Sequence, residues 1–196
     1  MGRKKLVDQR RADILDAFER CLLKFGLEEC TLERVAQEAG KSRNIIRHYI
    51  GNRDELIAAF VERVLVRIKE GAANMLANTP KPRLIPEVLD FLFWERSTDD
   101  APDLGDRMLG GMWRIREQNP RTQQALLNFY REFEKILTEG LTRLYPKASV
   151  KKCQEIAYSI ICLAETNWVL GGVGVDKSHT RMARRSAEYL LQSLEG

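Results

Sequence analysis

The chain has little of what metal proteins, cofactor enzymes and membrane proteins need. It holds two histidines and four cysteines in 196 residues, and no two cysteines are spaced C-x-x-C, so no metal site and no cofactor is expected. No run of eighteen apolar residues occurs, which argues against a membrane-spanning helix. The basic N-terminus lacks the apolar stretch of a signal peptide, so we expect a cytoplasmic protein with no membrane partner.

Sequence motifs of catalysis are missing as well. There is no H-E-x-x-H, no G-x-S-x-G, no phosphate-binding loop and no dinucleotide fingerprint. The glycine cluster at 171–174 follows a helical pattern and lacks the spacing that cradles phosphates. Both histidines can be explained without catalysis, because His48 lies on a polar helix face and His179 near a helix start. The sequence therefore predicts a protein that is not an enzyme.

Alternation with a period of two residues is not found over any useful length, so no β-sheet is predicted. Apolar residues recur instead at spacings of three and four, which predicts an all-α fold. A mobile arm is expected at 1–7, a proline-rich loop at 79–83 and a polar interruption at 97–105. Helices are expected over about 8–25, 31–39, 42–49, 53–78, 84–96, 106–117, 120–144, 150–170 and 179–194.

The four cysteines are scattered. Cys21 and Cys162 stand among apolar residues at helical spacing, which favours buried reduced thiols over a redox sensor.

Residues 31–49 predict two short helices joined by a tight turn. Thr31 and Ser42 suit the N-cap, because their side-chain oxygens can accept from free backbone N–H groups, and Gly40 suits the left-handed end of a helix. The apolar inner faces comprise Leu32, Val35, Ala36 and Ala39 in the first helix and Ile46, Tyr49 and Ile50 in the second. The opposite face of the second helix carries Arg43, Asn44, Arg47 and His48.

Positive charge is concentrated in the N-terminal part of the chain, which contains residues 31–49. Residues 1–53 hold twelve lysines and arginines against eight acidic residues, whereas residues 54–196 hold twenty of each. Phosphate binding needs such a local positive field, and a helix with polar outward side chains can reach base edges in the major groove. The alternative is a solvated helix on an ordinary helical domain.

The segment from Thr31 to Leu56 resembles the N-terminal signature of the TetR family of transcriptional regulators. The match is specific, since it fixes many positions at once, and it covers about the first 60 residues. The rest of the chain is similar to that family only in architecture. The matching residues are Thr31, Val35-Ala36, Ala39-Gly40, Ser42, His48-Tyr49 and Arg53-Asp54-Glu55-Leu56.

The resemblance implies a helix-turn-helix DNA-binding domain at 1–53 and a larger helical ligand-binding and dimerisation domain at 54–196, joined by the long helix. It further implies a homodimer that binds a palindromic operator in double-stranded DNA, with the recognition helix at 42–49. Thr31, Arg34 and Arg53 match phosphate-contacting positions. The other matching DNA-contact positions are Ser42, Arg43, Asn44, Ile45, Arg47, His48 and Tyr49.

Four residues depart from the family pattern. Lys41 replaces a common valine, Asn44 a small residue, Arg47 a tyrosine and Ile50 a phenylalanine. The first three add polarity or charge at the expected DNA face. Because arginine can pair with guanine and asparagine with adenine, the operator of this chain is expected to be its own.

The last two helices are usually the dimer interface in this family. Apolar stripes here permit the same arrangement, and a two-fold operator needs a two-fold protein, although the stripes can also pack within one chain. The expected interface residues are Ile156, Ile160, Leu163, Tyr189 and Leu190.

Large aromatic side chains gather in the second domain and predict an apolar cleft for a small molecule. Residues 162–173 are similar to the matching helix of the branch that controls choline and betaine genes, which implies a cation held by tryptophans and a carboxylate. The alternative, which we favour for any single residue, is that these side chains are core. The candidate lining is Phe93, Trp94, Met112, Trp113, Tyr130, Glu165 and Trp168.

The preferred function is thus a homodimeric repressor released from its operator by a small-molecule effector. In this mechanism the ligand moves the helix that begins at Arg53 and so changes the separation of the two recognition helices. The alternatives are a DNA-binding regulator without a small-molecule ligand and, less favoured, a helical enzyme.

Overall fold

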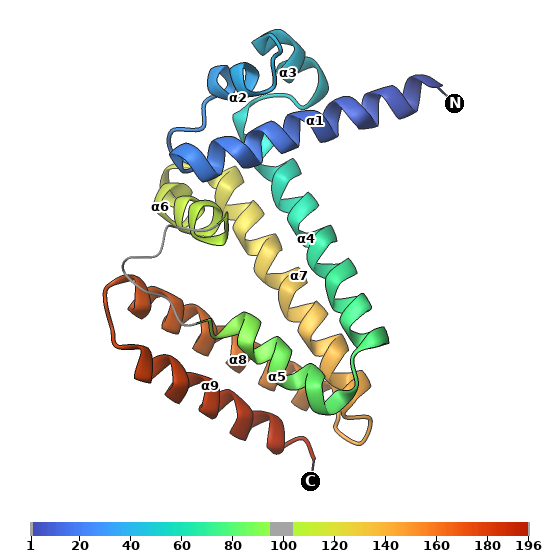
Figure 1. Cartoon of the computed structure of the whole chain (residues 1–196), viewed down its shortest axis with the longest axis vertical. Helices are drawn as coiled ribbons and strands as arrows, with labels where there is room; N and C mark the ends of the chain where they lie inside the picture. Colours follow the sequence, from blue (N-terminus) through green and yellow to red (C-terminus); the bar gives the residue numbers. More distant parts are fainter. Residues whose placement is uncertain (1, 95–103, 196) are drawn as a thin grey trace. The chain divides into compact units, whose positions relative to one another are not determined.

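A computed structural model of the chain describes residues 2–94 and 104–195 (Figure 1). Throughout this described part the regular secondary structure is helical, which confirms the predicted all-α fold. Most of the polar interruption predicted at 97–105 lies outside the described residues. The helix predicted to continue to Arg96 is wrong at that end, because it stops at Leu92 and Phe93 already has non-helical backbone angles.

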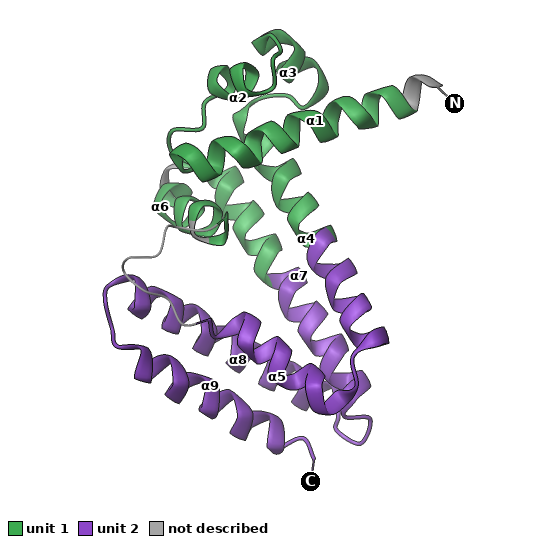
Figure 2. Ribbon diagram, viewed as in Figure 1, with its two compact units in different colours: residues 1–66, 101–130 green, residues 67–100, 131–196 purple. Residues whose placement is uncertain are grey.

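The chain divides into two compact units (Figure 2). Unit 1 comprises residues 1–66 and 101–130, and unit 2 comprises residues 67–100 and 131–196. Two long helices, α4 (Arg53–Asn78) and α7 (Pro120–Leu144), each contribute to both units. The predicted boundary at residue 53 is one between a DNA-binding part and a ligand-binding part. As a functional boundary it stays a prediction.

Unit 1 is built on α1 (Gly2–Phe25), α2 (Leu32–Glu38), α3 (Arg43–Tyr49) and the start of α4. The rings of Phe18 and Phe60 meet edge to face with centroids 5.2 Å apart, and both side chains are buried. The prediction of a mobile arm at 1–7 is wrong, because α1 begins at Gly2. Leucine and lysine favour helices, and nothing between Gly2 and Asp8 breaks one. Ile14, Leu22, Val35 and Ile46 complete the centre of the core.

A short mixed helix packs on the turn that follows α1. It begins with π-helical backbone at Asp106–Gly110, continues as α6 (Gly111–Ile115) and ends in a 3₁₀ turn at Arg116–Gln118. A Cβ atom placed on Gly111 would lie only 2.4 Å from the Cβ of Leu27. Glycine at 111 therefore lets this helix approach the turn between α1 and α2 closely.

Unit 2 contains α5 (Lys81–Leu92), α8 (Val150–Gly172) and α9 (Lys177–Gln192) together with the later parts of α4 and α7. The predicted loop at 79–83 is shorter than expected, since α5 already begins at Lys81. Pro82 lies in the first helical turn, where a missing N–H costs little. The core is formed mainly by Leu89, Phe93, Leu141, Cys153, Ala157, Ile160, Ala187 and Leu191.

Three of the four cysteines, Cys21, Cys30 and Cys153, are buried free thiols. Burial raises the pKa of Cys21, and it raises the pKa of Cys30 to about 12, so both stay protonated at neutral pH. The prediction that Cys162 is buried is wrong, because this thiol is exposed on α8. Its apolar neighbours in sequence lie on other faces of the same helix.

Within residues 2–94 and 104–195, no helix has the length and apolar character needed to cross a membrane. The same residues hold no group of three or more histidine, cysteine or acidic side chains that could bind a metal ion.

Gly111→Ala should destabilise the protein. The added methyl group would overlap the buried Leu27 side chain, so we expect the free energy of unfolding to fall by about 1–3 kcal/mol. Gly71→Ala is the matched control, because Gly71 lies in α4 with nothing within 4 Å of the added Cβ. That variant should gain roughly 0.5–1 kcal/mol, since alanine favours a helix over glycine. Urea unfolding of both variants measures the difference, and equal stability would contradict the close approach.

Candidate nucleic-acid interface

The turn between α2 and α3 has the local geometry that the sequence predicts. Thr31 is extended, with φ −81° and ψ 158°, and its side chain accepts from the Arg34 N–H at 3.3 Å. Gly40 adopts φ +61°, a left-handed conformation that side chains rarely tolerate. Ser42 is also extended at the N-cap of α3, but its hydroxyl makes no capping hydrogen bond. The Ser42 side chain is exposed at the N-terminal end of α3.

The outward face of α3 is exposed and polar. Ile46 is fully buried and anchors the helix, whereas Tyr49 is half-buried with its ring edge-on to His48 at 4.9 Å. Arg43 pairs with Glu33 of α2 at 2.7 Å, an exposed ion pair of the kind that contributes little to stability. Side chains exposed on this face are Ser42, Arg43, Asn44, Ile45, Arg47 and His48.

Several contacts from α1 hold α2 and α3 in place. Arg11 donates to the backbone carbonyl of Tyr49 at 2.7 Å, and so satisfies a free carbonyl at the end of α3. Arg20 and Lys24 both reach the carboxylate of Glu38, at 2.8 and 2.7 Å, and lower the pKa of that group. Lys41 lies 3.9 Å from Asp13 of α1 with little exposure, so it does not add charge to the DNA face as the sequence suggested.

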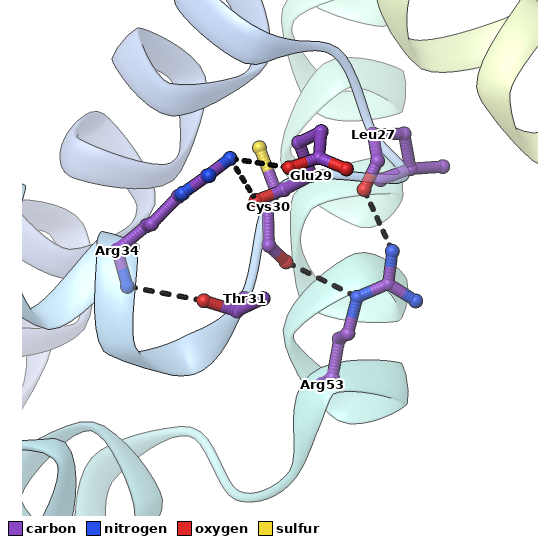
Figure 3. A network of polar contacts seen from close by, with 6 residues as sticks. All are labelled: Leu27, Glu29, Cys30, Thr31, Arg34 and Arg53. Carbon is purple, nitrogen blue, oxygen red and sulfur yellow. Dashed lines mark hydrogen bonds and ion pairs between the residues drawn. The ribbon is translucent and has the colours of Figure 1, made fainter.

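Arg34 already has partners inside the protein. Its guanidinium donates to the carboxylate of Glu29 at 2.8 Å and to the carbonyl of the same residue at 3.1 Å (Figure 3). It also lies over the ring of Phe25, 4.9 Å from the centroid. A phosphate contact by Arg34 stays a prediction, and it requires that the phosphate share or replace Glu29.

Arg53 ties the start of α4 to the turn at residues 26–31, which we call the α1–α2 turn. Its Nε donates to the carbonyl of Cys30 at 3.1 Å, and its Nη2 donates to the carbonyl of Leu27 at 2.7 Å (Figure 3). Sequence reasoning missed this role, because a backbone carbonyl leaves no trace in residue identity. A guanidinium has five N–H donors, so Arg53 keeps further donors for the predicted phosphate contact, which stays a prediction.

The residues predicted to line a ligand pocket are divided between the two units. Met112, Trp113 and Tyr130 lie in unit 1, where Trp113 Nε1 donates to the Tyr130 hydroxyl at 3.2 Å. Met112 is fully buried, as expected of a core side chain. Phe93, Trp94, Glu165 and Trp168 lie in unit 2, where Phe93 is buried and Trp94 is exposed.

The predicted interface residues on α8 and α9 also differ in exposure. Ile156 and Ile160 belong to the core of unit 2, and Leu163 and Leu190 pack against that core. Burial within one chain leaves Ile156 and Ile160 little surface for a second copy, so a dimer interface needs other residues. Tyr189 is 62% exposed and remains available. Further exposed apolar side chains on these helices are Tyr158, Val169, Leu170 and Met182, and Val173 directly after α8 is exposed too.

Similarity to known regulators extends over nearly the whole chain. A transcriptional regulator named BetI from Burkholderia ambifaria is 28% identical over 203 residues, covering 94% of this chain and 93% of the relative. The nicotine-responsive repressor HdnoR of Paenarthrobacter nicotinovorans is 25% identical, covering 76% and 73%. A crystal structure of a TetR regulator from Haloarcula marismortui superimposes with a TM-score of 0.72 at 17% identity, covering 95% of this chain and 98% of that one. No family model matches the chain.

The chain is thus similar over nearly its whole length to curated helix-turn-helix transcriptional regulators, and its fold is that of TetR regulators of known structure. The names of these relatives support DNA-binding transcription regulation, in agreement with the prediction from residues 31–56. That the helix-turn-helix at 31–49 binds DNA, with α3 as its recognition helix, stays a prediction. Which side chains contact DNA stays a prediction.

Arg47→Ala and Arg53→Ala should separate base reading from positioning. Without Arg47, we expect the ratio of operator affinity to random-DNA affinity to fall about tenfold, because a good arginine–guanine pair discriminates by about 1–3 kcal/mol. Without Arg53, both affinities should fall together and the salt dependence should become shallower. Arg53→Ala should also lower the free energy of unfolding by about 1–3 kcal/mol, since two charge-assisted hydrogen bonds to the turn are lost.

Fluorescence titration with an operator duplex selected from random DNA measures both affinities. Arg131→Ala serves as the control, because Arg131 is exposed on α7 in unit 2. Equal loss on operator and random DNA for Arg47→Ala would refute its reading of a base. An Arg53→Ala protein as stable as the unmodified chain would refute its role at the turn.

Proposed function

We propose that this regulator is a cytoplasmic, homodimeric repressor that a small molecule releases from a palindromic operator. The observation that supports it most is the exposed polar face of α3, held from behind by the buried Ile46 and by contacts from α1. A rigid helix with outward arginine, asparagine and histidine side chains meets the needs of the major groove.

In this proposal the DNA contacts divide into two kinds. Asn44, Ile45 and Arg47 read base edges, with the Ile45 side chain against a thymine methyl group. Thr31, Ser42 and Arg43 contact phosphates, for which Arg43 exchanges its surface ion pair with Glu33. Phosphate contacts fix the position of the helix, and base contacts select the sequence.

The exposed apolar side chains of α8 and α9 support a second copy of the chain as partner. Tyr158 and Val169 on α8 and Met182 and Tyr189 on α9 are each more than half exposed. Aromatic and methionine side chains are enriched in protein interfaces, and two-fold symmetry matches a palindromic operator.

Release by an effector needs a path to the recognition helix, and the α1–α2 turn of unit 1 offers one. Arg114 of α6 makes two hydrogen bonds to the carboxylate of Glu28 in this turn and lowers the pKa of that carboxyl. Asn119 donates to Asp54 at the start of α4 at 2.7 Å. A shift of α6 would therefore pull on the turn that precedes α2. The nicotine-responsive relative supports ligand control of this kind.

Tyr189→Asp tests the dimer. The side chain is 62% exposed, so the fold should tolerate the change, whereas a buried charge in the dimer should weaken association about thirtyfold or more. Sedimentation velocity measures association, and titration with operator DNA measures the consequence. Leu127→Asp is the matched control, since Leu127 is an exposed apolar residue of unit 1.

The dimer proposal predicts that Tyr189→Asp lowers affinity for the full operator but not for a single half-site. An unmodified protein that stays monomeric at every concentration would contradict it. So would a Tyr189→Asp variant that associates as tightly as Leu127→Asp.

A further inference from the structure

Unit 2 has a cleft of about 580 Å³ between the end of α5 and one side of α9. Ligand pockets commonly have volumes of roughly 300–1,000 Å³, so this cleft has the size for a small organic molecule. Neither the DNA contacts nor the dimer face proposed above uses the residues that line it.

Three arginines of α9 line one side of the cleft. Arg181, Arg184 and Arg185 are spaced i, i+3 and i+4, so they share one side of the helix. Ala187 and Leu191 are buried in the core of unit 2 and orient this helix. The packing of α9 on the core therefore turns the arginine side of the helix toward the cleft.

Arg184 is held in a fixed position. Its Nε and Nη2 donate to one carboxylate oxygen of Asp90 on α5, at 3.1 and 2.8 Å, and its Nη1 donates to Glu188. Its side chain is 27% exposed. Arg185, by contrast, is exposed and has no hydrogen bond or ion pair within the described part of the chain.

Two aromatic residues complete the cleft. Phe93 is 3% exposed and packs into the core, whereas the adjacent Trp94 is 53% exposed. A half-exposed indole beside guanidinium groups offers a flat apolar surface for a ring, with cationic donors at its edge.

The sign of the charge decides what class of ligand fits. Among the described residues that line the cleft, three are arginines and two are carboxylates, Asp90 and Glu188, so this part of the lining carries a net positive charge. We propose that the cleft binds a flat organic acid, whose carboxylate accepts from Arg185 and whose ring lies against Trp94. This is the opposite of the cationic ligand that residues 162–173 suggested.

This inference deepens the proposed function by naming the chemical class of the effector. The binding itself does not depend on regulation, because it rests on the cleft alone. Desolvated charge-assisted bonds to guanidinium are strong, but Arg185 is exposed, so solvent reduces the gain.

Benzoate is the probe, and it is compared with benzamide and choline by ligand-detected NMR and calorimetry on the DNA-free full chain. Benzoate should bind at least about tenfold more tightly than neutral benzamide, since only the acid gains charge-assisted hydrogen bonds. Choline, which carries a cationic head and no carboxylate, should bind no better than benzamide.

Variants locate the site. Arg185→Gln and Trp94→Leu should each weaken benzoate binding about fivefold, the scale of one exposed charge-assisted contact or one ring contact. Arg131→Gln is the matched control, because it removes an exposed arginine of unit 2 outside the cleft, and it should leave benzoate binding unchanged. Thermal unfolding of each variant shows that it is folded.

The outcomes separate this inference from the proposed function. Benzamide or choline binding as tightly as benzoate, or benzoate binding unaffected by both Arg185→Gln and Trp94→Leu, would overturn the cleft proposal. Benzoate binding in the cleft without any change in operator affinity would overturn its role as effector class and leave the site intact. Failure of the ligand-free protein to bind any DNA would instead overturn the proposed function.

Discussion

The guanidinium of Arg53 is the contact on which the N-terminal unit depends. It joins the first residue of the long helix α4 to two carbonyls of the α1–α2 turn, at Leu27 and Cys30. These carbonyls lie in an irregular turn: that of Leu27 also accepts from the Cys30 N–H at 3.2 Å, whereas Arg53 supplies the donor for that of Cys30. Because α2 begins immediately after this turn, its starting point is fixed by α4. Helix α3 then follows from α2 through the Gly40 turn.

The same turn receives the mixed helix at residues 106–118. Gly111 permits the close approach to Leu27, and Arg114 binds Glu28. The turn thus contacts α4 through Arg53 and α6 through Gly111 and Arg114, within a single compact unit. π-Helical backbone, found here directly before α6, is often located at functional sites in proteins. We regard this turn as the place where a change in α6 would be converted into a change in α3.

The sequence predicted those elements that show a periodic apolar pattern or a local signal at a helix end. The bounds of α4 and α7 agree with the expected 53–78 and 120–144, since long amphipathic patterns and a first-turn proline mark them clearly. The sequence did not predict which residues cover a given apolar face. The apolar stripe through Ile156 and Ile160 shows only that this face is covered, and the structure shows that the covering residues come from the same chain. The α5–α9 cleft was missed, because Asp90 and Arg184 are 94 residues apart in sequence.

Hydrogen exchange with and without operator duplex tests the central claim most directly, namely that α2, the Gly40 turn and α3 form the DNA-binding surface. Amides bound at a protein–DNA interface exchange more slowly, because opening the local structure becomes costlier. The account predicts slower exchange in peptides that cover Thr31–Tyr49 and no change in peptides that cover α9. Unchanged exchange across Thr31–Tyr49 in a protein saturated with operator, or slowing confined to unit 2, would contradict it.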